Sequence, residues 1–156
     1  MQLLFVCTGN TCRSLMAEAL ASKILHRLNM AGKFKVASAG LAAFPGAPAS
    51  SGARSVLSRE GVDVSEHQAK QLTEEMLHNA DLILTMTAAQ KQHLRDLFPE
   101  AAEKIFILKE FADQSQDTEY DIPDPFGQPE SVYQQCAEEL ARVIEATLTR
   151  LQSESR

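Results

Sequence analysis

Positive charge, cysteine and long apolar runs are all scarce in this 156-residue sequence. The 15 Lys and Arg residues are outnumbered by 21 Asp and Glu residues, and the net charge of −6 argues against nucleic-acid binding through a general basic surface. No apolar run approaches the roughly 20 residues that span a bilayer. The apolar stretch before Cys7 is also too short for a signal peptide. We therefore expect a cytoplasmic protein that binds neither nucleic acid nor a membrane.

The 3 cysteines are too few, and odd in number, for a disulfide framework. A zinc site built on Cys7 and Cys12 would lack a matching second pair of ligands, so we expect no metal. The sequence also has no internal repeat, linker or low-complexity tail. With 44% hydrophobic and 23% charged residues, its length fits one globular domain over residues 1–156.

Short apolar segments alternate with helical patterns along the chain. The expected strands are residues 3–6, 34–38, 81–86 and 104–108. Five helices are expected. The first begins at Leu15 and has its stop signal at Gly32, the second covers 53–59 and stops at Gly61, and the third follows an N-cap at Thr73. The fourth runs from Thr87 to Phe98, and the last begins near Pro129. Continuously apolar strands that alternate with helices are typical of a parallel sheet covered on both faces. The predicted fold is a three-layer α/β domain with a four-stranded parallel sheet.

Residues 109–128 interrupt the alternation of strands and helices, because they show little periodicity over about twenty residues. We expect a loop here that acts as an active-site flap. The segment carries Asp117, Asp121 and Asp124, and spacing alone does not choose among them as a general acid.

The stretch "VCTGNTCRS" predicts an anion site where the first strand turns into the first helix. Backbone N–H groups in the first turn of a helix lack internal partners, and the helix dipole adds positive charge. Gly9 allows the loop to curl, and Asn10 tolerates a left-handed backbone. Arg13 offers a planar fork that suits two phosphoryl oxygens.

Cys7 is expected at the bottom of this phosphate-binding loop. Amides, Arg13 and a hydrogen bond from Ser14 should favour its thiolate form. A loop that binds a tetrahedral dianion and aims a sulfur nucleophile at its centre is a cysteine phosphatase site. The alternative is a buried strand-end thiol in an ordinary turn, since Cys-x5-Arg alone occurs often by chance. A Walker-type loop is excluded because Gly-Lys-Ser/Thr is absent.

"VCTGNTCRS", with "MAEA" behind it, resembles the phosphate loop of the low-molecular-weight protein-tyrosine-phosphatase family. The likeness extends through "SAG" (38–40), "LTEEM" (72–76), "ADLILTMT" (80–87), "IFILKEF" (105–111) and "DPFG" (124–127). It implies that Cys7 is the nucleophile, Arg13 binds phosphate and Asp124 is the general acid. Implied substrate-binding or loop-bracing residues are Thr8, Gly9, Asn10, Thr11, Cys12, Ser14, Ser38 and Phe126. Leu15 departs from the family's usual Pro, so we expect a slightly looser loop.

Two positions resemble a branch of this family that hydrolyses phosphoarginine on proteins. Thr11 replaces a bulkier aliphatic residue, and Gly127 replaces the second aromatic of the flap. We therefore expect a monomeric, cofactor-free protein-arginine phosphatase, with a protein-tyrosine phosphatase as the alternative. An arsenate reductase would need further cysteines after the third strand. A non-catalytic oxyanion-binding module would leave Asp124 unexplained.

The remaining cysteines and the histidines have simpler interpretations. Cys12 is either a small packing residue or the resolving partner of an oxidised Cys7, a role that the resemblance favours. Cys136 lies on the apolar stripe of the last helix and is expected in the core. His26, His67, His78 and His93 show no partner spacing, so we expect them at the surface or hydrogen-bonded.

Overall fold

The computed structural model describes residues 1–113 and 119–155. In this part of the chain four parallel strands form one sheet in the order β2-β1-β3-β4. The strands are β1 (Gln2–Cys7), β2 (Lys35–Gly40), β3 (Leu82–Thr85) and β4 (Ile105–Ile107). The predicted parallel α/β fold is therefore confirmed.

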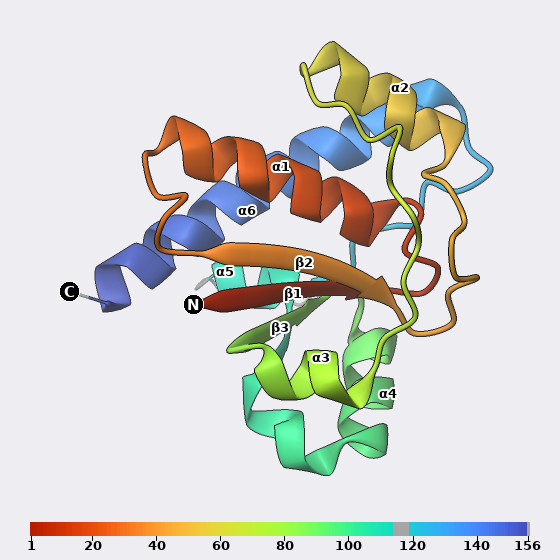
Figure 1. Cartoon of the computed structure of the whole chain (residues 1–156). Helices are drawn as coiled ribbons and strands as arrows, with labels where there is room; N and C mark the ends of the chain where they lie inside the picture. The colour runs from red at the N-terminus through yellow and green to blue at the C-terminus, as the bar shows by residue number, and fades with distance from the viewer. Residues whose placement is uncertain (114–118, 156) are drawn as a thin grey trace.

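Helices cover both faces of this sheet (Figure 1). They are α1 (Arg13–Arg27), α2 (Ser51–Arg59), α3 (Glu74–Asn79), α4 (Ala88–Leu97), the 3-10 helix η1 (Pro99–Lys104), α5 (Leu108–Ala112) and α6 (Glu130–Glu154). The N-caps expected at Thr73 and Thr87 are confirmed, since each side chain accepts a hydrogen bond from the backbone three residues on. Within the described residues, no helix is long and apolar enough to cross a membrane.

The two faces of β1 explain the three layers. Successive side chains of a strand point to opposite faces. Leu3 and Phe5 belong to a buried cluster shared with α1, α2 and α6, whereas Leu4 and Val6 belong to a second cluster shared with α3 and α4. All four side chains are buried, so β1 is the covered centre of the sheet.

Several element ends differ from the predictions. Helix α1 stops well before Gly32, and the left-handed residue that follows it is Asn29, with φ 59°. The prediction of a continuous loop over 109–128 is wrong at its start, because residues 108–112 form α5. A helix of this length has too few residues to show a period. Helix α4 ends at Leu97 rather than at the expected Phe98, and Pro99 begins η1, an element that was not predicted.

The phosphate-binding loop lies at a reversal in the winding of the sheet. Strand β1 is followed by α1 on one face, and its neighbour β3 is followed by α4 on the other (Figure 1). In open parallel sheets the carboxyl ends of strands at such a reversal form a ligand-binding crevice. Cys7 is the last residue of β1 and therefore opens into this crevice.

Candidate active site

Cys7 is a buried free thiol that contacts two polar groups of its own loop. Its Sγ lies 3.3 Å from the backbone nitrogen of Asn10, which donates to it, and 2.9 Å from Ser14 Oγ. The Ser14 hydroxyl already accepts a hydrogen bond from Asn10 Nδ2 at 2.8 Å, so its own proton can point at the sulfur. Donors aimed at sulfur stabilise a thiolate.

Asn10 holds the loop in its curled conformation. Its backbone is left-handed, with φ 59°, and its side chain is fully buried. Besides the bond to Ser14, the Nδ2 group donates to Ser38 Oγ at 2.9 Å, and Oδ1 accepts from the backbone N–H of Lys70 at 2.9 Å. The Asn10 carbonyl oxygen lies 2.8 Å from His67 Nε2. One side chain thus joins the loop to two distant segments.

Arg13, the first residue of α1, connects the loop to the flap. Its guanidinium is nearly buried, and NH1 donates to the carbonyl oxygen of Ile122 at 2.9 Å. NH2 lies 3.7 Å from Asp124 Oδ2. A buried cation needs such polar partners. The ion pair itself is weak, since the Asp124 side chain is 52% exposed.

The structure distinguishes two of the three carboxyls considered as general acid. Asp121 Oδ1 accepts from the backbone N–H of Ala88 at the start of α4, so this carboxylate is used as a helix contact. Asp124 instead lies beside Arg13, and its Oδ1 accepts from the backbone N–H of Phe126 at 3.1 Å. Asp117 lies outside the described residues.

A comparison with known proteins agrees with this geometry. The family model for low molecular weight phosphotyrosine protein phosphatase matches residues 2–156. The chain belongs to this phosphatase family. A protein-arginine-phosphatase from Geobacillus stearothermophilus is 41% identical over 153 residues, which cover 98% of this chain and 97% of that protein.

Solved structures of the phosphatase family have the same fold. A low molecular weight protein tyrosine phosphatase from T. tengcongensis matches with a TM-score of 0.89 at 45% identity, over 96% of this chain and 99% of that one. A mutant of the YwlE arginine phosphatase, whose active-site serine is phosphorylated, matches with a TM-score of 0.90 at 37% identity, over 97% and 96%.

Gly9 and Gly40, the two glycines at the phosphate-binding loop, differ in how strictly the structure requires them. A Cβ atom on Gly9 would meet only Thr11 Oγ1 at 3.7 Å, an ordinary contact, so space does not force glycine there. A Cβ atom on Gly40 would lie 2.6 Å from the carbonyl oxygen of Thr8. The close approach of the loop to the end of β2 therefore depends on Gly40, which the sequence motif "SAG" contained without revealing this role.

Cys12 is a second buried free thiol of the loop. Its Sγ donates to Ser50 Oγ at 3.2 Å and lies 3.5 Å from the Tyr133 hydroxyl. Burial, and the hydrogen bond with Cys12, raise the pKa of Tyr133 to about 12. Cys136 is in the core, as expected, and burial raises the pKa of its thiol to about 12.

Three contacts of the loop, and one contact of its neighbour Ser38, had no signal in the sequence. His67 and the Ile122 carbonyl oxygen are described above. Ser38 Oγ donates to Glu18 Oε1 at 2.9 Å, and Gln90 Nε2 donates to Thr8 Oγ1 at 3.2 Å. Each of these partners lies far along the chain from the residue it contacts, so local patterns could not pair them.

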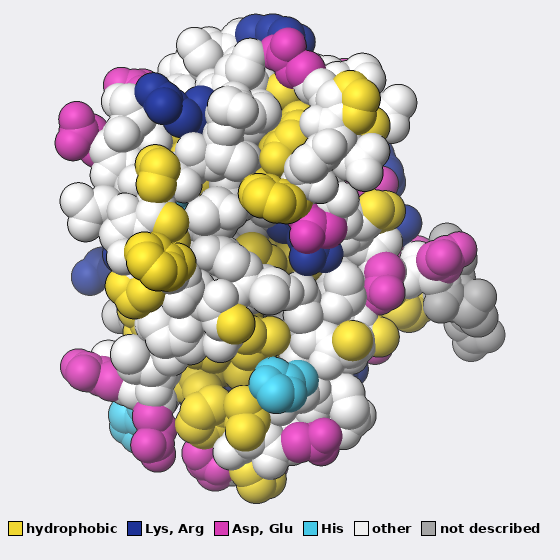
Figure 2. Space-filling view, turned by 90° about the vertical axis from the view of Figure 1, so that its right-hand side faces the viewer, with side chains coloured by type: hydrophobic (Ala, Val, Ile, Leu, Met, Phe, Trp, Pro, Cys, Tyr) yellow, Lys and Arg dark blue, Asp and Glu magenta, His cyan; other side chains and the backbone are white. Residues whose placement is uncertain are grey.

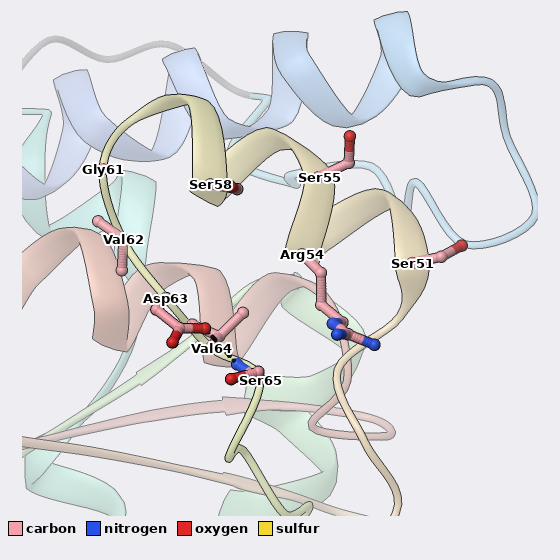
Figure 3. A pocket seen from close by; sticks show the side chains of 9 residues that line it. All are labelled: Ser51, Arg54, Ser55, Ser58, Gly61, Val62, Asp63, Val64 and Ser65. Atoms are coloured by element: carbon pink, nitrogen blue, oxygen red, sulfur yellow. Dashed lines mark hydrogen bonds between the residues drawn. The ribbon is translucent and has the colours of Figure 1, made fainter.

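A separate cavity of about 510 Å³ lies between α2 and residues 61–65 (Figure 3). Arg54 and Asp63 are among its lining residues, but no residue of the Cys7 loop lines it, so we do not assign the phosphatase chemistry to it.

On the face toward which the strands point, hydrophobic side chains lie in several separate places (Figure 2). Among the described residues, no group of three or more His, Cys, Asp or Glu side chains could hold a metal ion.

Proposed function

We propose that the chain is a cysteine-dependent protein phosphatase that hydrolyses phosphoarginine through a phosphocysteine intermediate. The observation that carries this proposal is the Cys7 sulfur, which accepts a hydrogen bond from Asn10 N and lies 2.9 Å from the Ser14 hydroxyl at the base of an anion-binding loop. A merely structural buried thiol would not need two polar partners. The neighbouring guanidinium of Arg13 adds the positive charge that a dianionic phosphoryl group requires.

In the first step, the Cys7 thiolate attacks phosphorus while the loop amides and Arg13 hold the phosphoryl oxygens. The P–N bond of phosphoarginine breaks as the S–P bond forms. Protonated Asp124 gives its proton to the leaving nitrogen, so the arginine side chain leaves with a new N–H bond and Asp124 becomes a carboxylate. The position of Asp124 beside Arg13 supports this role, because it brings the carboxyl next to the guanidinium that would bind the phosphoryl group.

In the second step, the Asp124 carboxylate takes a proton from a water molecule that attacks the phosphocysteine. The S–P bond breaks, inorganic phosphate leaves, and the Cys7 thiolate and the Asp124 acid are restored. The half-exposed side chain of Asp124 supports this step, since water has direct access to it. One carboxyl therefore serves first as acid and then as base.

Three observations support phosphoarginine as the substrate. Thr11 brings a small hydroxyl to the loop, which suits a polar guanidinium better than a phenol ring. Gly127 has φ 78°, a conformation that favours glycine, so a second aromatic side chain at this turn would strain the backbone. A relative that covers nearly the whole chain is named a protein-arginine-phosphatase.

Phosphotyrosine is the alternative substrate. Phe126 is 67% exposed and could pack against a substrate ring, and the T. tengcongensis relative is a tyrosine phosphatase. The deciding experiment measures kcat/KM on two peptides of the same sequence, one with phosphoarginine and one with phosphotyrosine. We expect a preference for phosphoarginine; a preference for phosphotyrosine would select the alternative.

We also propose a redox role for Cys12. Peroxide would oxidise the Cys7 thiolate to a sulfenic acid and be reduced to water, and the Cys12 thiol would then attack that sulfur, releasing water and forming a disulfide. Two free thiols in one loop support this reaction. After mild peroxide treatment, the recovery of activity by thiol reductant should weaken in Cys12→Ser.

A cytoplasmic location, a monomeric state and independence of cofactors remain predictions from the sequence.

A further inference from the structure

Gln90 is a buried polar side chain that reaches the phosphate loop from a helix on the opposite face of the sheet. Its Oε1 accepts from the backbone N–H groups of Met86 at 2.9 Å and Thr87 at 3.2 Å. Because two N–H donors occupy the oxygen, the amide can have only one orientation. Its NH2 group therefore faces Thr8 and donates to Thr8 Oγ1 at 3.2 Å.

This contact determines what the Thr8 hydroxyl can do. The oxygen accepts from Gln90, and in the described part of the chain no group accepts the Thr8 hydroxyl proton. Thr8 is exposed, so this proton is available to a bound molecule. The backbone of Thr8 is also held, since its carbonyl oxygen accepts from Ala42 N at 2.9 Å and packs closely over Gly40. A hydroxyl that accepts one hydrogen bond is a stronger donor of the next.

Thr8 is linked to both the nucleophile and the segment that carries Asp124. It follows Cys7 directly in the chain. The junction between β3 and α4 that orients its hydroxyl also anchors the flap, because the carbonyl oxygen of Met86 accepts from Ile122 N at 2.9 Å. Asp124 follows two residues later and contacts Arg13. The Thr8 hydroxyl thus lies at the end of β1, one residue from the nucleophile, and its partner Gln90 belongs to the junction that holds the Asp124 segment.

We propose that the Thr8 hydroxyl binds a phosphoryl oxygen of the substrate, and that Gln90 is the positioning residue that turns its proton toward that oxygen. The inference rests on the proposed phosphatase function of the Cys7 loop, and it applies to phosphoarginine and phosphotyrosine alike. The phosphoryl dianion offers only acceptors, so the direction of the Thr8 hydrogen bond decides whether the residue attracts or repels it.

Gln90→Glu tests the direction of this hydrogen bond. The carboxylate can still accept from Met86 and Thr87, but it has no N–H, so the Thr8 hydroxyl must reverse and donate to it. Hydrogen bonds to charged groups contribute enough that losing one should weaken binding of inorganic phosphate about 10- to 100-fold. Thr8→Val should cause a loss of similar size, and Thr8→Ser should retain binding.

The added negative charge needs its own control. Ala89→Glu places the same charge on the preceding residue of α4, which is exposed, without contacting Thr8. This variant should change phosphate binding by less than about 3-fold at moderate salt. Thermal unfolding followed by far-UV circular dichroism checks that each variant is folded. A loss in Ala89→Glu equal to that in Gln90→Glu would overturn the proposal.

A double-mutant cycle isolates the hydroxyl. In a Thr8→Val background, Gln90→Glu should have little further effect, because the group that it reorients is gone. An equal loss with and without the hydroxyl would overturn the inference. Calorimetric binding of inorganic phosphate needs no turnover, so these results stand even if peptide hydrolysis fails. If instead phosphoarginine is hydrolysed normally and Thr8→Val binds phosphate like the unmodified protein, only the Thr8 inference is lost.

Discussion

Replacing Asn10 by alanine should destabilise the protein far more than its small size suggests. The side chain makes three hydrogen bonds, to Ser14, Ser38 and the backbone of Lys70. Each is worth about 1 kcal/mol. Alanine must also adopt the left-handed backbone at φ 59°, which costs it about 1 kcal/mol. We therefore expect Asn10→Ala to lower the free energy of unfolding by about 4 kcal/mol, a large part of the total for a domain of this size.

Asn29 provides a matched control. Its φ is also 59°, but among the described residues its side chain has no hydrogen-bond partner. Asn29→Ala should therefore show the backbone cost alone, about 1 kcal/mol. Urea unfolding followed by far-UV circular dichroism measures both values. If the two variants lose the same stability, the Asn10 side-chain bonds do not hold the loop, and the reasoning is refuted.

Three further predictions concern the chemistry. Cys7→Ser should abolish turnover but keep phosphate binding, and Arg13→Lys should lose most activity because an ammonium cannot form the bidentate fork; turnover by Cys7→Ser would contradict a covalent intermediate. Asp124→Asn should lower kcat more on phosphoarginine than on an activated aryl phosphate, whereas Asp121→Asn should affect both weakly; equal losses in Asp124→Asn would argue against proton donation. Thr11→Ile should shift the kcat/KM ratio toward phosphotyrosine by about 10–200-fold, and a parallel fall on both substrates would refute that role.

The phosphate loop was predictable because its main contacts are local. Cys7, Asn10 and Ser14 lie within one turn and the start of one helix, so their spacing alone places them together. The sheet was predictable for a related reason, since each strand is a short apolar run between helical patterns. Boundaries were less accurate where a single residue decides them, as at Asn29, where the chain turns before Gly32 is reached.

The supporting contacts were not predictable from local patterns. Gln90 looks like part of a helix cap, and nothing near it indicates that its amide also reaches Thr8 across 82 residues of sequence. The Ile122 contact with Arg13 uses a backbone carbonyl oxygen, which any residue possesses. Helix α5 was missed because its five residues are held by the packing of α6 rather than by a periodic pattern.

The long reach of these contacts has a consequence for biosynthesis. Arg13 contacts a carbonyl oxygen 109 residues further along the chain. A ribosome therefore synthesises the stretch "VCTGNTCRS" long before the residues that surround this stretch in the folded protein. Until then, Arg13 of the nascent chain lacks both the Ile122 carbonyl oxygen and the neighbouring Asp124. The enzyme should become catalytically active only when translation has passed Ile122 and Asp124. An N-terminal fragment that carries the intact "VCTGNTCRS" stretch should therefore have no phosphatase activity.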